Sequence, residues 1–159
     1  MIAYFDYPDR LILASLQEDA TLNLETLAFD CGLSIASVQR RLKKLRKAGV
    51  IQREVAILNP DALGQAMTFI IMVELERERL DLLDAFRRSA RAEPQVQQCY
   101  YITGDADFTL ICTARDMADF EALTQRLFFE NANVRRYRTS VVMGRTKIGL
   151  AIPVSLKQQ

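Results

Sequence analysis

The sequence contains no histidine, no tryptophan and only three cysteines. Without histidine the chain has no Ser-His-Asp triad and no imidazole base, and it lacks the commonest metal ligand in proteins. Cys31, Cys99 and Cys112 are far apart and form no Cys-x-x-Cys pair. We therefore expect reduced thiols, with no disulfide framework and no metal site. These absences argue against most enzyme classes, and we expect neither catalysis nor a bound cofactor.

A long apolar run and a large net charge are also missing. No segment approaches the ~20 apolar residues of a membrane span. Residues 1–6 lack the basic region that opens a secretory signal. Of the 159 residues, 50% are hydrophobic and 26% are charged, as in ordinary globular proteins. We expect a cytoplasmic protein of one or two domains with no membrane partner.

Positive charge is concentrated in one short segment, although the net charge is only +1. Residues 1–38 contain six acids and one base, whereas residues 39–53 contain seven bases and no acid. From residue 59 onward the two signs balance at 13 each. Such a basic stripe is typical of proteins that contact the phosphate backbone of nucleic acid, but a solvated helix face has the same pattern.

The N-terminal third predicts three helices. The first spans about residues 8–18. Asn23 is the expected N-cap of a second helix that Gly32 ends, and Ser34 caps a third helix after a short turn. Residues 52–58 then read as a short β segment. Together these elements predict a winged helix-turn-helix domain over residues 1–58.

The third predicted helix has two different faces. At about 100° per residue, Val38, Leu42 and Leu45 form a narrow core stripe, and basic residues lie opposite. Small residues near its N-terminal end suit entry into a major groove, where Gln and Arg read base edges. The predicted DNA contacts, with the last one on the wing, are Ser34, Ser37, Gln39, Arg40, Arg41, Lys44, Lys47 and Arg53.

Residues 59–66 contain Pro60 and Gly64 and form the expected hinge. Beyond it, the periodicity predicts strands over residues 67–76, 96–103, 108–113 and 134–144. Helices are expected from Leu80 to before Pro94 and over residues 116–129. The order β-α-β-β-α-β is the ferredoxin-like arrangement, an antiparallel sheet with two helices on one face. We predict an α+β protein whose second domain spans residues 67–153, followed by a tail over residues 154–159.

The first predicted strand of this domain suggests a partner. Residues 69–73 are apolar at consecutive positions, so both faces of the strand require burial, yet the helices cover only one face. An exposed apolar sheet face marks an interface. We predict a symmetric homodimer with sheets packed face to face. Burial under the N-terminal domain or the C-terminal tail is the alternative.

Several short motifs follow one another along the chain: Asp9-Arg10, Leu27-Ala28, Gly32-Leu33-Ser34, Arg40-Arg41-Leu42, Gly49-Val50-Ile51, Leu63-Gly64, residues 103–108 and Ile152-Pro153. In their order and spacing, these motifs resemble the Lrp/AsnC family of transcription regulators, the feast/famine regulators. The resemblance implies a regulator of double-stranded DNA with a C-terminal small-molecule-sensing RAM domain. It also implies dimers that often assemble into octamers and bind amino acids at subunit interfaces. Arg46-Lys47-Ala48 stands where the family often has an acidic residue, which makes this third helix unusually basic.

Residues 104–107, Gly-Asp-Ala-Asp, are the second candidate site. From the residues alone they are typical of a hairpin turn. The resemblance implies an effector role, because a carboxylate can bind the ammonium group of an amino acid and backbone N–H groups its carboxylate. The predicted effector contacts are Tyr101, Thr103, Gly104, Asp105, Asp107, Thr139 and Val141. A nearby run, Arg135, Arg136 and Arg138, is interpreted as a salt-bridged or solvated edge, with a site for an anionic ligand as the alternative.

The leading hypothesis is a sequence-specific DNA-binding regulator controlled by a small metabolite, by resemblance an amino acid. An architectural protein that wraps DNA with little effector response is the alternative. Sirohaem decarboxylases share the two-domain layout, but they rely on histidines near the tetrapyrrole, and this chain has none.

Overall fold

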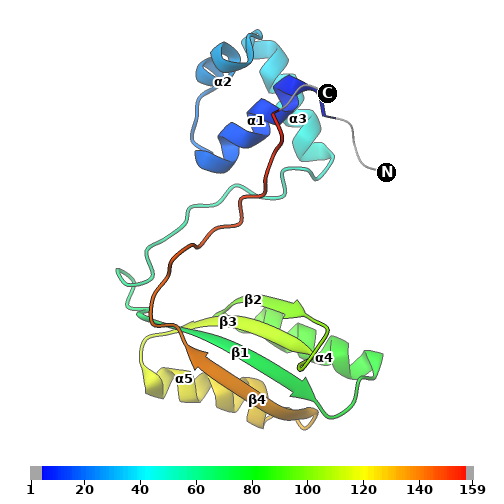
Figure 1. The fold of residues 1–159 in the computed structure, drawn as a ribbon, viewed down its shortest axis with the longest axis vertical. Coiled ribbons are helices and arrows are strands. Elements are labelled where there is room, and N and C mark those ends of the chain that lie inside the picture. The colour runs from blue at the N-terminus through cyan, green and yellow to red at the C-terminus, as the bar shows by residue number, and fades with distance from the viewer. Residues whose placement is uncertain (1–4, 157–159) are drawn as a thin grey trace. The chain divides into compact units, whose positions relative to one another are not determined.

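The computed structural model describes residues 5–156, which form two compact units. One unit contains the chain up to Ile57 together with the C-terminal segment from Lys147, and the other is Leu58–Thr146 (Figure 1). Residues 147–153, which the prediction assigns to the second domain, group with the helical unit. The Gln17 side chain exchanges two hydrogen bonds with the Ile152 backbone, at 3.0 and 2.8 Å. The predicted tail is described only as far as Leu156.

The helical unit contains α1 (Tyr7–Glu18), α2 (Leu24–Cys31) and α3 (Ile35–Lys47). Asn23 and Ser34 are the N-caps of α2 and α3, as predicted, and their side chains accept backbone hydrogen bonds at 2.8 and 3.3 Å. Gly32 ends α2 with a φ of +63°, a left-handed conformation that favours glycine. These caps produce the tight turn between α2 and α3.

The core of this unit confirms the predicted stripe of α3. Val38, Leu42 and Leu45 are buried, and they pack in one cluster with Ile12 of α1 and Leu27 of α2. Because these residues come from all three helices, burying them fixes the helices against one another. The opposite side of α3 is thereby left exposed.

The β segment predicted over residues 52–58 is not formed, and this prediction is wrong. No strand is assigned there, and the sheet of the described chain contains no partner for it. A β segment needs a neighbouring strand to pair its N–H and C=O groups. The alternation of apolar residues in this segment indicates a tendency toward extended backbone, but it does not provide a neighbouring strand.

The second unit contains β1 (Met67–Leu75), α4 (Leu80–Ala92), β2 (Val96–Tyr101), β3 (Phe108–Ala114), α5 (Met117–Thr124) and β4 (Val134–Val141). A π-helical turn, Gln125–Phe129, continues α5. The strands are antiparallel in the order β2-β3-β1-β4, and both helices lie on one side of the sheet (Figure 1). The predicted ferredoxin-like arrangement is confirmed.

Three of the four predicted strands end earlier than expected, β1 by a single residue and β2 and β4 by more. β2 stops at Tyr101, because the Ile102 N–H turns to the carbonyl of Asp107 at 2.9 Å and closes a turn. β4 stops at Val141, because β1 begins at Met67 and offers only one more bond, from Val142 N to Thr68 O.

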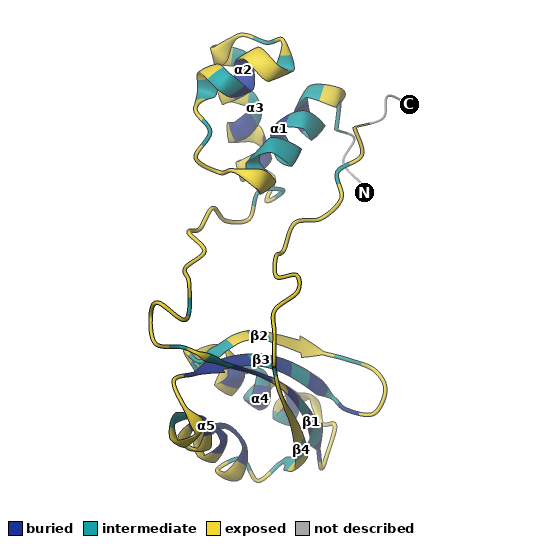
Figure 2. Ribbon diagram, turned by 60° about the vertical axis from the view of Figure 1, so that its left-hand side comes forward, coloured by how far each residue is buried: buried dark blue, intermediate teal, exposed yellow. Residues whose placement is uncertain are grey.

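The two faces of β1 have different surroundings, as the consecutive apolar residues suggested. Phe69, Ile71 and Val73 are fully buried against the helices, and the Phe69 ring stacks on Phe120 with centroids 3.8 Å apart. Ile70 alternates with them on the opposite face and is 40% exposed. Figure 2 shows β1 and β3 as the buried centre and β2 and β4 as exposed edges. Within this unit, the second face of the sheet has no helix over it.

Candidate nucleic-acid interface and ligand loop

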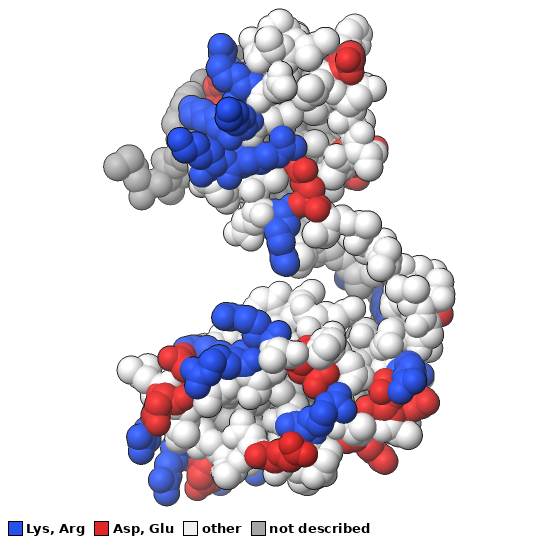
Figure 3. Space-filling model, turned by 180° about the vertical axis from the view of Figure 1, so that it is seen from behind, with Lys and Arg blue, Asp and Glu red and all other residues white. Residues whose placement is uncertain are grey.

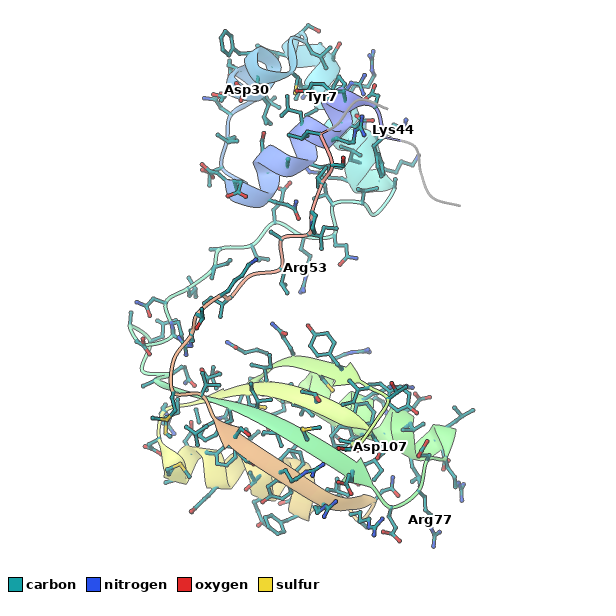
Figure 4. The ribbon with its side chains drawn as sticks, in the orientation of Figure 1. Tyr7, Asp30, Lys44, Arg53, Arg77 and Asp107 are labelled. Carbon is teal, nitrogen blue, oxygen red and sulfur yellow. The ribbon has the colours of Figure 1, made fainter. Side chains whose placement is uncertain are left out.

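The outer face of α3 carries unneutralised positive charge. We call the exposed residues Arg40, Lys43, Lys44 and Lys47 the outer basic face. None of them forms an ion pair within residues 5–156. Figure 3 shows Lys and Arg side chains gathered on one side of the helical unit, and Figure 4 labels Lys44. Unpaired cations on one helix face attract a phosphate backbone. Lys43 belongs to this face, although the predicted contacts did not include it.

The predicted DNA contacts with uncharged side chains lie at the N-terminal end of α3. The Ser34 hydroxyl accepts from the Ser37 N–H and donates to the Ser37 hydroxyl, at 3.3 and 3.0 Å. Ser34 and Gln39 are exposed, and Ser37 is half-buried. A helix N-terminus presents backbone N–H groups that favour an anion such as phosphate. Arg53 is exposed in the segment after α3 (Figure 4).

Arg41, which was predicted to contact DNA, is paired inside the unit. Its Nη1 donates to Asp9 Oδ1 at 2.7 Å, and its Nη2 lies 2.8 Å from Asp6 Oδ2. These hydrogen bonds raise the pKa of Arg41, and the bond to Asp9 has the largest effect. A backbone hydrogen bond from Asp9, assisted by Arg41, lowers the pKa of Asp6. Both carboxylates are more than 30 residues away in the chain, so the helical pattern of α3 did not reveal them.

Asp107 in the candidate ligand loop supports the sheet. Its Oδ2 accepts from the Leu75 N–H at 2.6 Å, and its own N–H donates to the Val73 carbonyl at 2.9 Å. The side chain therefore joins the start of β3 to the end of β1 (Figure 4). The structure shows a structural role for Asp107, which was predicted as an effector contact.

The tip of the same loop is open. Thr103, Gly104 and Asp105 are exposed, and Gly104 has a φ of +119°. The Asp105 carboxylate accepts no hydrogen bond within the described chain, and its backbone carbonyl accepts from Arg138 Nη2 at 3.3 Å. Asp105 therefore keeps its carboxylate available for an ammonium group.

The remaining predicted effector contacts lie on opposite edges of the sheet. Tyr101 is on β2, whereas Thr139 and Val141 are on β4, and two strands separate these edges. At about 4.8 Å per strand the edges are roughly 14 Å apart. Tyr101 packs on Phe108, and the Arg87 guanidinium lies 5.1 Å from its ring centroid. A single chain does not bring these predicted contacts into one pocket.

Two of the three arginines of β4 share one carboxylate, and Arg135 forms no ion pair within the described chain, so this edge keeps positive charge. Arg136 and Arg138 lie 2.7 and 3.4 Å from Glu74 Oε1. Hydrogen bonding from Arg136 lowers the pKa of Glu74 and raises that of Arg136. A shallow hollow of about 450 Å³ lies beside them, lined by Phe128, Tyr137 and their neighbours, but not by the 104–107 turn.

Other classes of site are not found in the described part of the chain. No three His, Cys, Asp or Glu residues among residues 5–156 are grouped to hold a metal ion. In the same range no helix combines the length and apolar character of a membrane span. Burial raises the pKa of the Cys112 thiol to about 12, so this cysteine is an inert core residue.

Comparison with known proteins identifies relatives of both units. A family model described as winged helix-turn-helix DNA-binding matches residues 5–52, and the Lrp/AsnC ligand binding domain matches residues 68–152. An uncharacterised HTH-type transcriptional regulator of Sinorhizobium fredii is 46% identical over 95% of this chain and 89% of its own length. A leucine-responsive regulatory protein of Rhizobium meliloti is 32% identical over 89% of this chain and 91% of its own length.

Solved structures agree over nearly the whole chain. A transcriptional regulator from Neisseria meningitidis in complex with L-methionine has a TM-score of 0.88 at 29% identity, covering 94% of this chain and 97% of its own. A feast or famine regulatory protein from M. tuberculosis, also in complex with L-methionine, has a TM-score of 0.83 at 26% identity, covering 91% and 96% of the two chains.

Proposed function

This chain belongs to the Lrp/AsnC family of DNA-binding transcriptional regulators, and we propose that an amino acid bound by its C-terminal unit controls its binding to DNA. Two relatives of the same fold were solved with L-methionine, and this observation carries the proposal. The exposed, unpaired carboxylate of Asp105 supports it from this chain's own residues.

The DNA-binding half of the proposal rests on α3. The outer basic face contacts phosphates, while Ser37 and Gln39 near the N-terminal end of the helix approach base edges. Phosphate contacts give affinity and salt dependence, whereas base contacts give the sequence preference. Arg53 adds a phosphate contact after the helix.

The effector half requires more than one copy of the chain. The ammonium group of the ligand binds the Asp105 carboxylate, and backbone N–H groups of the 104–107 turn bind the ligand carboxylate. Because Tyr101 and Thr139 lie on opposite edges, a site that uses both combines edges from different copies. We propose that the effector binds at such a subunit interface and shifts the assembly between states that differ in DNA affinity.

The open face of the sheet provides the first of these interfaces. Ile70 is 40% exposed there, and Met72 and Ile111 lie half-buried on the same face. An apolar centre of this kind suits a second copy packed face to face in a homodimer. Assembly of these dimers into an octamer is the further step that the family resemblance implies.

A thermal-shift screen of the purified protein against the twenty amino acids, with L-methionine as the first probe, tests the effector half. A ligand that binds only the folded state stabilises it by RT ln(1 + [L]/Kd), about 2.7 kcal/mol at a hundredfold excess over Kd. We expect one or a few amino acids to raise Tm. Asp105→Ala should abolish this shift, and Glu121→Ala, which removes an exposed carboxylate of α5, should retain it.

Two outcomes would count against the effector half. A ligand-induced rise in Tm that persists in the Asp105→Ala variant would show that the ligand binds elsewhere. No shift with any amino acid, combined with tight DNA binding, would favour the architectural alternative, in which the protein organises DNA without an amino-acid signal.

A further inference from the structure

Arg41 differs from its basic neighbours on α3, because its charge is directed toward α1. Its side chain is 26% exposed, and the Asp9 side chain that it meets is only 11% exposed. Arg40, one residue earlier, is exposed on the outer basic face. We propose that Arg41 is a positioning residue, which fixes the angle of the recognition helix α3 on α1 and leaves DNA contact to the outer basic face.

The geometry is that of a guanidinium fork between two carboxylates. Nη1 donates to Asp9 Oδ1 at 2.7 Å and to Asp6 Oδ1 at 2.9 Å, while Nη2 meets Asp6 Oδ2 at 2.8 Å. A planar guanidinium holds two partners in fixed directions, which the single ammonium of lysine does not. The fork therefore resists both sliding and rotation of α3 against α1.

The same carboxylate of Asp6 also caps the N-terminus of α1. Its Oδ1 accepts from the Asp9 N–H at 3.0 Å, so Asp6 is the N-cap of α1 and a partner of Arg41 at once. The first turn of α1 and the middle of α3 are thereby joined through one polar cluster. The buried stripe of α3 packs beside this cluster but is apolar and non-directional, so the ion pairs supply the directional restraint.

Burial of Asp9 makes an exchange of partners costly. Asp9 is only 7% exposed, and a buried carboxylate that loses its cation is strongly destabilising. If Arg41 swung out to a phosphate, Asp9 would remain buried without a cation within the described chain. The raised pKa of Arg41 and the lowered pKa of Asp6 agree with a stable pair.

The test compares four variants on two DNA probes. The probes are a duplex selected by the wild-type protein from a random pool and an unselected 40-base-pair duplex. Arg41→Gln removes the fork, and Arg41→Lys keeps the charge but loses the geometry. Asp9→Asn removes the partner while leaving Arg41 in place, and Arg40→Gln is the matched control on the outer basic face. Affinities are measured over a salt series at a temperature where circular dichroism shows every variant folded.

We expect Arg41→Gln and Asp9→Asn to weaken binding to the selected duplex by about tenfold while the salt slope stays unchanged, because base contacts are misplaced and no phosphate contact is lost. The affinity of Arg41→Lys for the selected duplex should lie between those of the wild type and Arg41→Gln. Arg40→Gln should weaken binding to both duplexes and reduce the slope by about one ion.

Two outcomes would overturn the proposal. If Arg41 contacts phosphate, Arg41→Gln lowers the slope by about one ion, and Asp9→Asn strengthens binding, because it frees the guanidinium. If Arg41 only stabilises the fold, Tm falls and both affinities of the folded variants match the wild type. The inference rests on the DNA-binding half of the proposed function and not on the effector, so a failed amino-acid screen leaves it unaffected. If the wild-type protein selects no duplex from the pool and does not bind the unselected duplex, DNA binding is overturned and this inference with it.

Discussion

The 104–107 turn shows how two residues of one type acquire different roles. Asp105 and Asp107 are two positions apart, and the sequence assigned both to the effector site. In the structure the carboxylate of Asp107 accepts from the backbone of Leu75, a residue that is 7% exposed. Asp105 is exposed and uses only its carbonyl, as the acceptor for Arg138. The difference arises because β1 lies next to Asp107 and not next to Asp105.

Substitution of these two residues should therefore have opposite consequences. Asp107→Ala leaves the buried Leu75 N–H without an acceptor, and we expect the free energy of unfolding to fall by about 1–3 kcal/mol. Asp105→Ala should change it by less than about 0.5 kcal/mol. Urea denaturation followed by circular dichroism measures both. Equal losses in the two variants would contradict the structural role of Asp107.

At the scale of elements, the turn between α2 and α3 determines where the recognition helix begins. Gly32 has a left-handed φ of +63°, and Ser34 caps α3 immediately afterwards. Both residues were identified from sequence, because caps and C-terminal glycines act within a few residues. A change in the backbone here moves the start of α3.

Gly32→Ala tests this turn. No atom lies within 4 Å of the added Cβ, so the cost comes from the left-handed backbone alone, about 1 kcal/mol in the free energy of unfolding. Gly144→Ala is the control, since its φ is not positive and its surroundings are equally open. Thermal and urea denaturation should show a loss for the first variant only. A loss of the same size in both would show that the left-handed φ is not its cause.

At the scale of the whole molecule, the open sheet face should determine assembly. Ile70→Glu places a charge at the apolar centre of that face, and we expect it to convert the proposed dimer into monomer at micromolar concentration. Leu80→Glu is the control, since Leu80 is 77% exposed at the start of α4. Size-exclusion chromatography with light scattering reports the mass. A wild-type monomer, or a dimer that persists in Ile70→Glu, would contradict face-to-face packing.

The pH dependence of stability also belongs to the whole chain, because histidine is absent throughout. Burial raises the pKa values of Cys31, Cys99 and Cys112 above 9.0, so none of these thiols titrates near neutrality. Hydrogen bonds, several from arginines, lower the pKa values of four carboxylates below 3.8 or 4.5. These are Asp6, Asp19, Glu74 and Asp119.

A lowered pKa in the folded state adds stability that is fully present above the unfolded pKa and lost as pH falls through the folded value. We therefore expect Tm to be nearly constant from about pH 5.5 to 7 and to fall below about pH 4. Differential scanning calorimetry across this range measures it. A step in Tm near pH 6.5 would contradict the expectation.

The sequence by itself determined the features that depend only on residues close together in the chain. The helix caps, the core stripe of α3 and the order of strands and helices follow from local periodicity and turn chemistry, which act over a few residues. The concentration of positive charge on α3 follows in the same way. These features also carried the resemblance to the family, so the class of function was predictable.

Only the tertiary structure decided which charges are paired and which edges meet. Arg41 meets Asp6 and Asp9 because α1 packs beside α3, and Asp107 meets Leu75 because β1 lies next to β3. Tyr101 and Thr139 are separated by the strand order, and residues 52–58 have no strand partner within the described chain. Each outcome joins segments distant in sequence, and no local pattern encodes such a pairing, because it depends on how complete elements pack.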